Sequence, residues 1–176
     1  MDNILMRRII SEDVPALSVM AKQTFYDTFT GTCTEYDMEE FLEYYYNEPT
    51  LEKQLEEGID YFFAEINGEP VGYLSFKDEQ PDFEEIKGSS ALELKRFYVN
   101  KEFHGTAVAH DMMQFLTDHA QSQGYDNIFL GVWEFNFRAQ KFYTKYGFML
   151  TGHRHDFPIG NTPQTDVYMI KFLNRP

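Results

Sequence analysis

The sequence predicts an α/β domain built on a mixed sheet with one parallel strand pair in its middle. In the second half of the chain, strand-like and helix-like segments alternate, an order typical of parallel pairing. In the first half, the dipeptide Asn67-Gly68 separates two apolar runs, which indicates a hairpin and therefore antiparallel strands as well. No repeat, low-complexity tract or Gly/Ser-rich linker is found, so residues 1–176 are expected to form one domain.

The first half is expected to supply a strand, three helices and the hairpin. Ser11, Glu12 and Asp13 suit a helix start, because Ser caps helices and acidic residues favour the positive end of the helix dipole. The expected helices cover residues 11–29, 35–47 and 50–58, the second ending near Pro49. The expected strands cover residues 5–10, 61–66 and 71–76, before an acidic loop at about residues 78–90.

The second half is expected to complete the sheet. A helix over residues 105–123 is stopped by Gly124, and a helix over residues 136–147 is capped by Asn136 and ended by Gly147. The expected strands cover residues 91–99, 127–133, 148–157 and 165–173.

Charge and cysteine content exclude several classes of function. The net charge of −14 disfavours binding to nucleic acid and to anionic membranes, whereas an acidic field concentrates cationic ligands. Cys33 is the only cysteine, which excludes an internal disulfide and fits a reducing compartment. The N-terminus has no apolar run long enough for a signal peptide or a membrane span, so a cytoplasmic protein is expected. His153 and His155 lack further ligands nearby, so no metal site is expected.

Residues 100–113 form a loop that leads into a helix, where an anion can bind. Helix N-termini leave backbone N–H groups without partners and carry partial positive charge, so a tight loop there can cradle a phosphate. Gly105 is the only glycine, but the four residues after it are small or modest in size and histidines flank the loop.

A second constellation covers residues 136–148. Ala139, Phe142, Tyr143 and Tyr146 share one helix face, and a core-facing aromatic stripe explains Phe142. The polar atoms of Asn136 and Tyr143 are not needed by such a stripe, which makes these residues candidates for function.

Residues 92–113 and 130–152 together resemble the GCN5-related N-acetyltransferase (GNAT) family. The resemblance extends over most of the chain, because the expected elements also follow the family's order. Residues 24–29, 130–134 and 164–170 look most like the bacterial Pai-type polyamine N-acetyltransferases. The family motif N-x-x-A-x-x-F-Y-x-x-x-G-F is matched by Asn136, Ala139, Phe142, Tyr143, Gly147 and Phe148.

The resemblance implies a GNAT-like, mostly antiparallel sheet with a parallel central strand pair and helices on both faces. It also implies transfer of an acetyl group from acetyl-CoA to an amine in a ternary complex. Main-chain groups of Phe97, Tyr98 and Val99 are then expected to hold the pantetheine arm and the thioester carbonyl. The other expected acetyl-CoA-binding residues are His104, Gly105, Thr106, Ala107, Val108, Ala109, His110, Asn136 and Arg138.

The acyl-CoA loop departs from the family pattern Q/R-x-x-G-x-G/A at two positions. His104 replaces the flexible Gln or Arg, although a protonated imidazole can also face a phosphate. Ala107 replaces the glycine of closest approach, and an alanine at positive φ costs about 1 kcal/mol. If residue 107 is already helical, the alanine costs nothing.

The resemblance also suggests catalytic residues. An alkyl ammonium has a pKa of about 10, so a base helps to remove its proton. Glu93 lies on the strand before the loop, as the family's catalytic glutamate does, and Glu134 is the substitute; the alternative for Glu93 is a solvated or paired strand residue. Tyr143 resembles the family's general acid. Since a phenol (about 10) is a weaker acid than a thiol (about 8.5), Tyr143 is expected to donate a hydrogen bond to the leaving sulfur before a proton.

The acceptor is expected to be a small cationic amine. Residues 35–57 carry nine acids against one base, with Tyr44, Tyr45 and Tyr46 among them. This mixture suits a polyamine such as spermidine or spermine through charge and cation–π contacts, although a solvated acidic helix face with inward tyrosines explains it too.

Two other functions stay open at this stage. One is an N-acetyltransferase that acts on a protein N-terminus or lysine. The other is a non-catalytic module, an acyl-CoA binder or sensor with an eroded loop. Family members often dimerise, and the aromatic content allows a homodimer.

Overall fold

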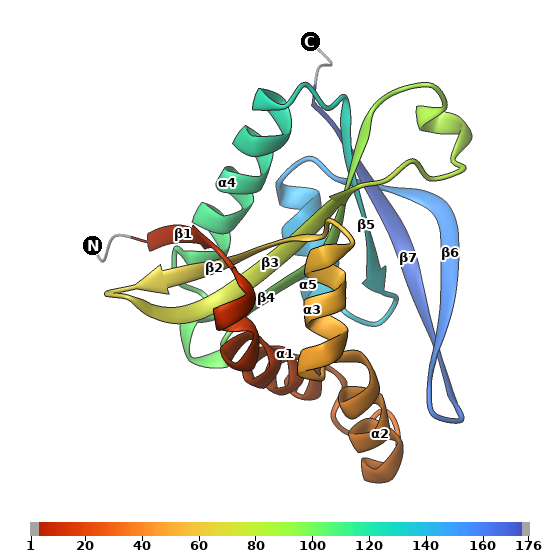
Figure 1. Ribbon diagram of the computed structural model, residues 1–176. Helices are drawn as coiled ribbons and strands as arrows, with labels where there is room; N and C mark the ends of the chain where they lie inside the picture. Colours follow the sequence, from red (N-terminus) through yellow and green to blue (C-terminus); the bar gives the residue numbers. More distant parts are fainter. Residues whose placement is uncertain (1–3, 174–176) are drawn as a thin grey trace.

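The computed structural model describes residues 4–173, which form one seven-stranded sheet with helices on both faces (Figure 1). The strand order is β1-β2-β3-β4-β5-β7-β6, and β4 and β5 are the only parallel neighbours in the described part. The predicted mixed, mostly antiparallel sheet with a parallel central pair is therefore confirmed. The strands are β1 (Ile4–Arg8), β2 (Asp60–Ile66), β3 (Glu69–Asp78), β4 (Ala91–Val99), β5 (Asn127–Trp133), β6 (Met149–Ile159) and β7 (Thr162–Phe172).

The β2–β3 hairpin turns at the predicted dipeptide. Asn67 has a φ of 53° and Gly68 a φ of 83°, so both central residues adopt the left-handed conformation of a type I′ turn. This turn matches the natural twist of the two strands, and it places Ile66 opposite Glu69.

The parallel pair at the centre of the sheet is short. β4 and β5 are in register only from Ala91 opposite Asn127 to Glu93 opposite Phe129. Beyond this point β4 stays paired with β3 as far as Val99, and β5 stays paired with β7 as far as Trp133. The carboxyl halves of β4 and β5 therefore diverge, and the sheet opens at its centre.

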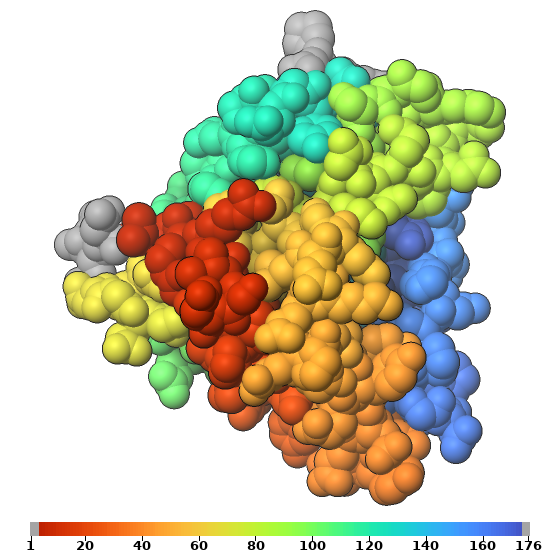
Figure 2. Space-filling model, viewed as in Figure 1, coloured from red at the N-terminus to blue at the C-terminus, as the bar shows by residue number. Residues whose placement is uncertain are grey.

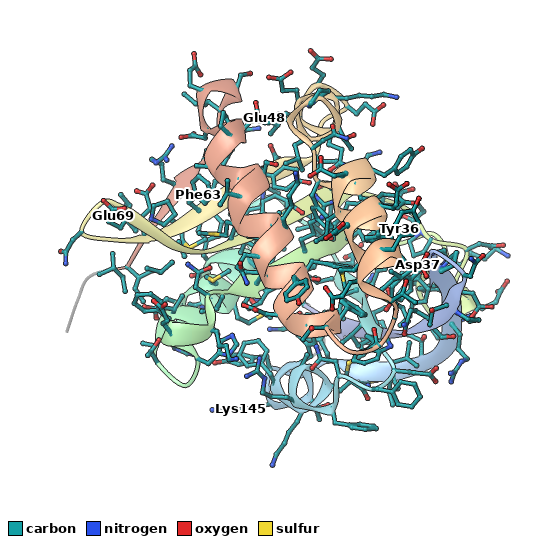
Figure 3. The ribbon with its side chains drawn as sticks, turned by 90° about the horizontal axis from the view of Figure 1, so that it is seen from below. Tyr36, Asp37, Glu48, Phe63, Glu69 and Lys145 are labelled. Carbon is teal, nitrogen blue, oxygen red and sulfur yellow. The ribbon has the colours of Figure 1, made fainter. Side chains whose placement is uncertain are left out.

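Within the described residues, five helices cover the two faces. In the space-filling view, the orange and amber residues of α2 and α3 lie beside the blue β6–β7 hairpin (Figure 2). Seen from below, Glu48 of α3 and Lys145 of α5 lie in outer layers on opposite sides (Figure 3). The helices are α1 (Val14–Phe29), α2 (Glu35–Tyr45), α3 (Glu48–Glu56), α4 (Val108–Ser122) and α5 (Phe137–Lys145), with short 3₁₀ turns at Ser11–Asp13, Glu84–Ile86 and Lys101–Phe103.

Each face of the sheet has its own apolar core. On the α4 side, Met112, Met113 and Leu116 pack among sheet residues such as Leu74 and Leu94. On the α1 side, Leu17, Ala21 and Phe25 belong to a core with Phe63 and Tyr73. Burial of these side chains supplies the main stabilisation of the fold and holds both halves of the divided sheet in place.

The start of α4 differs from the sequence prediction. The helix begins at Val108 rather than at Gly105, because Gly105 has a φ of +83°, which lies outside the helical region. Thr106 turns back instead, and its backbone N–H and its hydroxyl both donate to the carbonyl of Phe103.

The boundary between α2 and α3 also differs. α2 ends at Tyr45, and Pro49 lies in the first turn of α3, where a missing N–H costs no helical hydrogen bond. Asn47 caps α3, since its side chain accepts from the backbone N–H of Thr50 at 2.8 Å.

At the N-terminus, β1 ends at Arg8 rather than at Ile10, and α1 begins at Val14 rather than at Ser11. The backbone N–H of Ile10 donates to Asp13 Oδ2 at 3.0 Å, which turns the chain out of the strand.

The last two strands are longer than expected. β6 runs to Ile159 and β7 starts at Thr162, because Gly160 adopts a φ of +57° and closes a tight hairpin. Within residues 4–173, no helix combines the length and the apolar composition needed to cross a lipid bilayer.

Candidate active site

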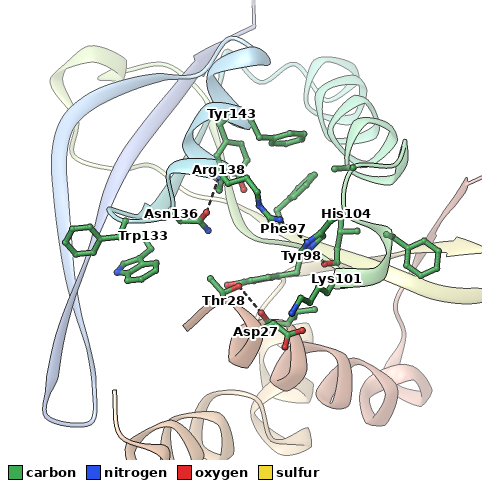
Figure 4. Close-up of a pocket in the computed structure, with 18 residues that line it drawn as sticks. Asp27, Thr28, Phe97, Tyr98, Lys101, His104, Trp133, Asn136, Arg138 and Tyr143 are labelled. Atoms are coloured by element: carbon green, nitrogen blue, oxygen red, sulfur yellow. Dashed lines mark hydrogen bonds between the residues drawn. The ribbon is translucent and has the colours of Figure 1, made fainter. Parts of the chain in front are cut away.

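The divergence of β4 and β5 opens a pocket of about 620 Å³ at the centre of the sheet (Figure 4). Its walls come from α1, the end of β4, the loop before α4, the end of β5 and α5. Nine of the predicted site residues line it: Phe97, Tyr98, Val99, His104, Gly105, Ala109, Asn136, Arg138 and Tyr143. The structure thus brings together two motifs that are separated by about thirty residues in the sequence.

One wall of the pocket is the unpaired edge of β4. Phe97, Tyr98 and Val99 pair with β3 on one side, whereas the parallel register with β5 stops at Glu93. Backbone groups on the β5 side of this segment therefore have no neighbouring strand. An extended ligand with amide groups can pair with such an edge as an added strand would.

The loop before α4 adopts a conformation that suits its unusual sequence. Ala107 has φ −71° and ψ −15°, which is the right-handed helical region. Gly105 is the residue with positive φ, so the alanine at position 107 carries no backbone strain. The sequence left open whether residue 107 has a positive φ or is already helical, and the structure shows that it is helical.

His104 and Arg138 join the loop to α5. The His104 Nε2 lies 2.8 Å from the carbonyl oxygen of Val99, and its Nδ1 lies 2.9 Å from Arg138 Nη1. A carbonyl only accepts and a guanidinium only donates, so Nε2 carries the proton and Nδ1 accepts. This pair of contacts ties the loop to α5, and Arg138 contributes a positive charge to the pocket lining.

Asn136 and Tyr143 are both placed by α5. The Asn136 Oδ1 caps the helix by accepting from the backbone N–H of Ala139 at 3.1 Å, which leaves its amide NH₂ without a protein partner in the described part of the chain. Tyr143 is 7% exposed and lines the pocket, and burial raises the pKa of its phenol well above the ordinary value.

Five predicted site residues lie outside the lining. Val108 is buried in the α4-side core, and His110 Nδ1 lies 2.7 Å from the hydroxyl of Tyr146. Thr106 and Ala107 shape the turn before α4. Glu93 lies on the paired part of β4, where its carboxylate contacts Lys95 Nζ at 2.9 Å.

Nine further residues line the pocket that were not among the predicted site residues, although Ala139 and Phe142 were named in the family motif. Trp133 is the last residue of β5, and Phe135 lies two residues beyond it. The aromatic and acidic residues at the end of this predicted strand could have indicated a site there. Lys101 is a second cation at the pocket. The complete set is Thr24, Asp27, Thr28, Lys101, Phe103, Trp133, Phe135, Ala139 and Phe142.

Comparison with known families identifies this arrangement. Residues 20–148 match the model of the Acetyltransferase (GNAT) family, a span that contains every residue lining the pocket. The chain belongs to the GNAT family of acetyltransferases.

Relatives and solved structures agree with GNAT membership. An uncharacterized N-acetyltransferase of Lactobacillus delbrueckii subsp. lactis is 29% identical over 174 residues, covering 98% of this chain and 99% of that protein. A probable spermine N(1)-acetyltransferase of Bacillus subtilis subsp. natto is 27% identical over 86 residues, covering 48% of this chain and 56% of that protein. The fold is similar to that of the PaiA N-acetyltransferase of Thermoplasma acidophilum, solved in complex with coenzyme A, with a TM-score of 0.77, 19% identity and coverage of 97% and 99%.

As a GNAT-type N-acetyltransferase, the protein uses acetyl-CoA as its co-substrate, and the pocket fits that molecule. Its volume of about 620 Å³ lies in the range of small-molecule sites. Its lining combines two cations, Arg138 and Lys101, with the open edge of β4 and the aromatic rings of Phe97 and Phe142, and this mixture is compatible with phosphates, amides and an aliphatic arm.

Proposed function

We propose that the protein transfers the acetyl group of acetyl-CoA to a primary amine of a small cationic acceptor, such as spermidine or spermine, by direct attack in a ternary complex. The observation that carries the proposal is the pocket itself, in which the open edge of β4 faces Tyr143 and the loop–α5 contact of His104 and Arg138. The name of the Bacillus relative, a probable spermine N(1)-acetyltransferase, supports a polyamine as acceptor.

The loop and α5 would hold the co-substrate. Arg138 and Lys101 are suited to the phosphates, and Gly105 lets the loop turn without a side chain in the way. The amide NH₂ of Asn136 is available as a further donor. Backbone groups of Phe97, Tyr98 and Val99 on the β5 side would fix the pantetheine arm and the carbonyl to be attacked.

Tyr143 would act at the sulfur. Acetyl-CoA supplies an activated acetyl group as a thioester, and the sulfur gains negative charge as the bond to carbon breaks. Burial raises the pKa of the Tyr143 phenol, so the hydroxyl stays protonated and acts first as a hydrogen-bond donor.

The acidic early helices support a cationic acceptor. Of the nine acids between Glu35 and Glu57, eight are exposed, and they lie on α2 and α3 with few basic neighbours. Tyr44 and Tyr45 are 70% and 44% exposed, whereas Tyr46 is 5% exposed and packs under Arg96. The tyrosine triplet is therefore divided, with two rings available to a ligand and one in the core.

An amine panel tests the proposal. Purified protein with acetyl-CoA is given spermidine, spermine, simple diamines, free amino acids and a lysine-containing peptide, and released CoA is followed with a thiol reagent. Polyamine-dependent release that exceeds release with the peptide is expected. Faster turnover of the peptide would favour a protein acetyltransferase, and no release with any amine would favour the non-catalytic module.

A further inference from the structure

Both carboxylates that the sequence suggested as bases are ion-paired. The Glu93 carboxylate contacts Lys95 Nζ at 2.9 Å, and Glu134 forms an ion pair with Arg154. Each of these carboxylates already has a cationic partner within the protein. A third acid, Asp166, is therefore the better candidate for the base.

Asp166 on β7 is the contrasting carboxylate. Within residues 4–173, its side chain makes no hydrogen bond and no ion pair, although most of it is shielded from solvent. Burial raises the pKa of this carboxyl from 3.8 to about 7. Desolvating a carboxylate without a partner is costly, and proteins seldom retain such a group unless a ligand uses it.

The sheet register places Asp166 opposite a residue of the pocket lining, although Asp166 is not itself one of the lining residues. Asp166 lies directly opposite Trp133 of β5 and opposite His155 of β6, so these three side chains project from the same face of the sheet. Trp133 lines the pocket, on the side next to the β6–β7 hairpin (Figure 4). The indole Nε1 of Trp133 is buried without a hydrogen-bond partner.

Gly131 keeps the space over this carboxylate open. It lies in the middle of β5 yet is exposed, and a Cβ added there would be 3.1 Å from Asp166 Oδ2. The Asp166 carboxylate therefore lies next to the backbone of Gly131, where there is no side chain. A side chain at position 131 would occupy the approach to Asp166.

The groups that face Asp166 do not neutralise it. Tyr168 lies on the same strand. Burial raises the pKa of its phenol, and the negative charges of Glu93 and Asp166 raise it further. Tyr46, at the end of α2, is also within electrostatic range. His155 of β6 lies opposite Asp166 but forms no hydrogen bond or ion pair with it in the described part of the chain. The other basic groups near this face have partners of their own: Arg96 donates to Gln54 and Tyr61, Lys95 contacts Glu93, and His153 contacts Glu85.

We propose that Asp166 binds the ammonium group of the acceptor and takes the proton that the amine must lose before attack. This inference rests on the proposed function. The ammonium passes one proton to the carboxylate and becomes a neutral amine, whose nitrogen lone pair then forms the bond to the acetyl carbon. The carbon–sulfur bond breaks, the second nitrogen proton goes to the departing sulfur, and Asp166 later returns its proton to water.

The test compares Asp166→Asn with Asp156→Asn. Asp156 is also an acid, on β6 and on the other face of the sheet, and it is satisfied by the hydroxyl of Thr165. Asp166→Asn is expected to lower kcat/KM for spermidine at pH 7 by about 100-fold or more, with an unchanged Kd for acetyl-CoA. The wild-type profile of kcat/KM against pH should show an acid limb near pH 7 that the variant lacks and that Asp156→Asn retains.

Gly131→Ala is a second variant that leaves the carboxylate in place. It is expected to lower kcat/KM for spermidine and to retain the acid limb, because it crowds Asp166 without removing it. Activity with Asp166→Asn that equals the wild type, with the acid limb retained, would overturn the inference while leaving the acetyltransferase proposal intact.

A direct titration separates this inference from the proposed function. Carbon-13 NMR of protein labelled at the Asp carboxyls, assigned by difference with Asp166→Asn, reports the protonation of Asp166 without turnover. Titration near pH 7 that shifts on addition of spermidine supports the inference. Titration near pH 4, or a signal that ignores spermidine, overturns it. Failure of the proposed function would instead appear as absence of CoA release by the wild type with every amine.

Discussion

Arg138 Nη1 donates a hydrogen bond to His104 Nδ1 across 2.9 Å, and His104 in turn donates to the carbonyl of Val99. This chain of contacts connects α5, the loop before α4 and the end of β4. These are three of the elements that line the pocket. The geometry of the loop therefore depends on α5, which also carries Tyr143.

Removal of Arg138 tests this link. Arg138→Ala removes a cation from the pocket and the donor to His104, so the Kd for acetyl-CoA is expected to rise about 5- to 30-fold, or roughly 1–2 kcal/mol. Isothermal titration calorimetry measures it. Lys141→Ala is the matched control, since it removes an exposed charge from the same helix outside the pocket. An unchanged Kd in Arg138→Ala would contradict the role of the contact.

Two substitutions in the loop should differ in their effect on acetyl-CoA binding. Ala107→Gly restores the family's glycine at a position that is already helical, and the Kd for acetyl-CoA should stay within about twofold of the wild type. Gly105→Ala forces an alanine to a φ of +83°, where the cost is conformational because no atom lies within 4 Å of the added Cβ. A loss of about 1 kcal/mol in stability and weaker acetyl-CoA binding are expected. Tighter binding by Ala107→Gly would mean that the loop is impaired by its alanine.

Asn136→Ala is expected to lower stability. The side chain satisfies the backbone N–H of Ala139 at the start of α5, and loss of such a cap costs about 1 kcal/mol. For a chain of this size the melting temperature should fall by roughly 2–4 °C, as calorimetry or circular dichroism would show. Asn136→Asp keeps the cap and should melt within about 1 °C of the wild type. A melting temperature of Asn136→Ala equal to the wild type would exclude the capping role.

Tyr143→Phe separates chemistry from binding. The hydroxyl would interact with sulfur only as the thioester breaks, so kcat should fall by about 10- to 100-fold. The Kd for acetyl-CoA should change by less than about twofold, since the ring is kept. Tyr125→Phe, outside the pocket, controls for loss of a phenol. Equal kcat in Tyr143→Phe and wild type would rule out the role of the phenol as donor.

Asp166 should carry a cost in stability that depends on pH. The pKa of about 7 in the folded protein lies above the ordinary 3.8, so the folded state holds the proton more tightly than the unfolded state does. Stability contributed by the protonated form is present at low pH and is lost as pH rises through about 7. At 1.36 kcal/mol per pKa unit the loss approaches roughly 4 kcal/mol.

Asp166→Asn should therefore gain stability relative to the wild type between pH 5 and pH 8. The measurement is the urea midpoint across this range, and Asp156→Asn should show no such trend. A difference between Asp166→Asn and the wild type that does not change with pH would contradict a buried, unpaired carboxylate.

Local patterns predicted much of the fold. The bounds of β4 and β5 were predicted residue for residue, and for β5 the reason is a mostly buried apolar run that begins and ends next to polar residues. The cap at Asn136 and the turn at Asn67 and Gly68 were predicted because both depend on neighbours in sequence. The start of α4 was predicted wrongly, since an apolar and small-residue pattern does not reveal the positive φ of Gly105.

The candidate site was predictable in its motifs and not in its long-range contacts. The interaction of His104 with Arg138 joins residues 34 positions apart, so it depends on the packing of α5 against the loop. The environment of Asp166 likewise depends on long-range contacts. The shielding of Asp166 from solvent arises because β7 pairs with β5 and β6. Its difference from Glu93 and Glu134 is seen only in the structure, where Lys95 and Arg154 pair with those two acids.

The most direct test of the central claim is a calorimetric titration of the wild-type protein with acetyl-CoA. One-to-one binding at micromolar concentration is predicted, because the loop is free of strain at Ala107 and Arg138 is held at the pocket by His104. No saturation up to about 1 mM, which corresponds to binding weaker than about −4 kcal/mol, would contradict the assignment of this pocket to acetyl-CoA.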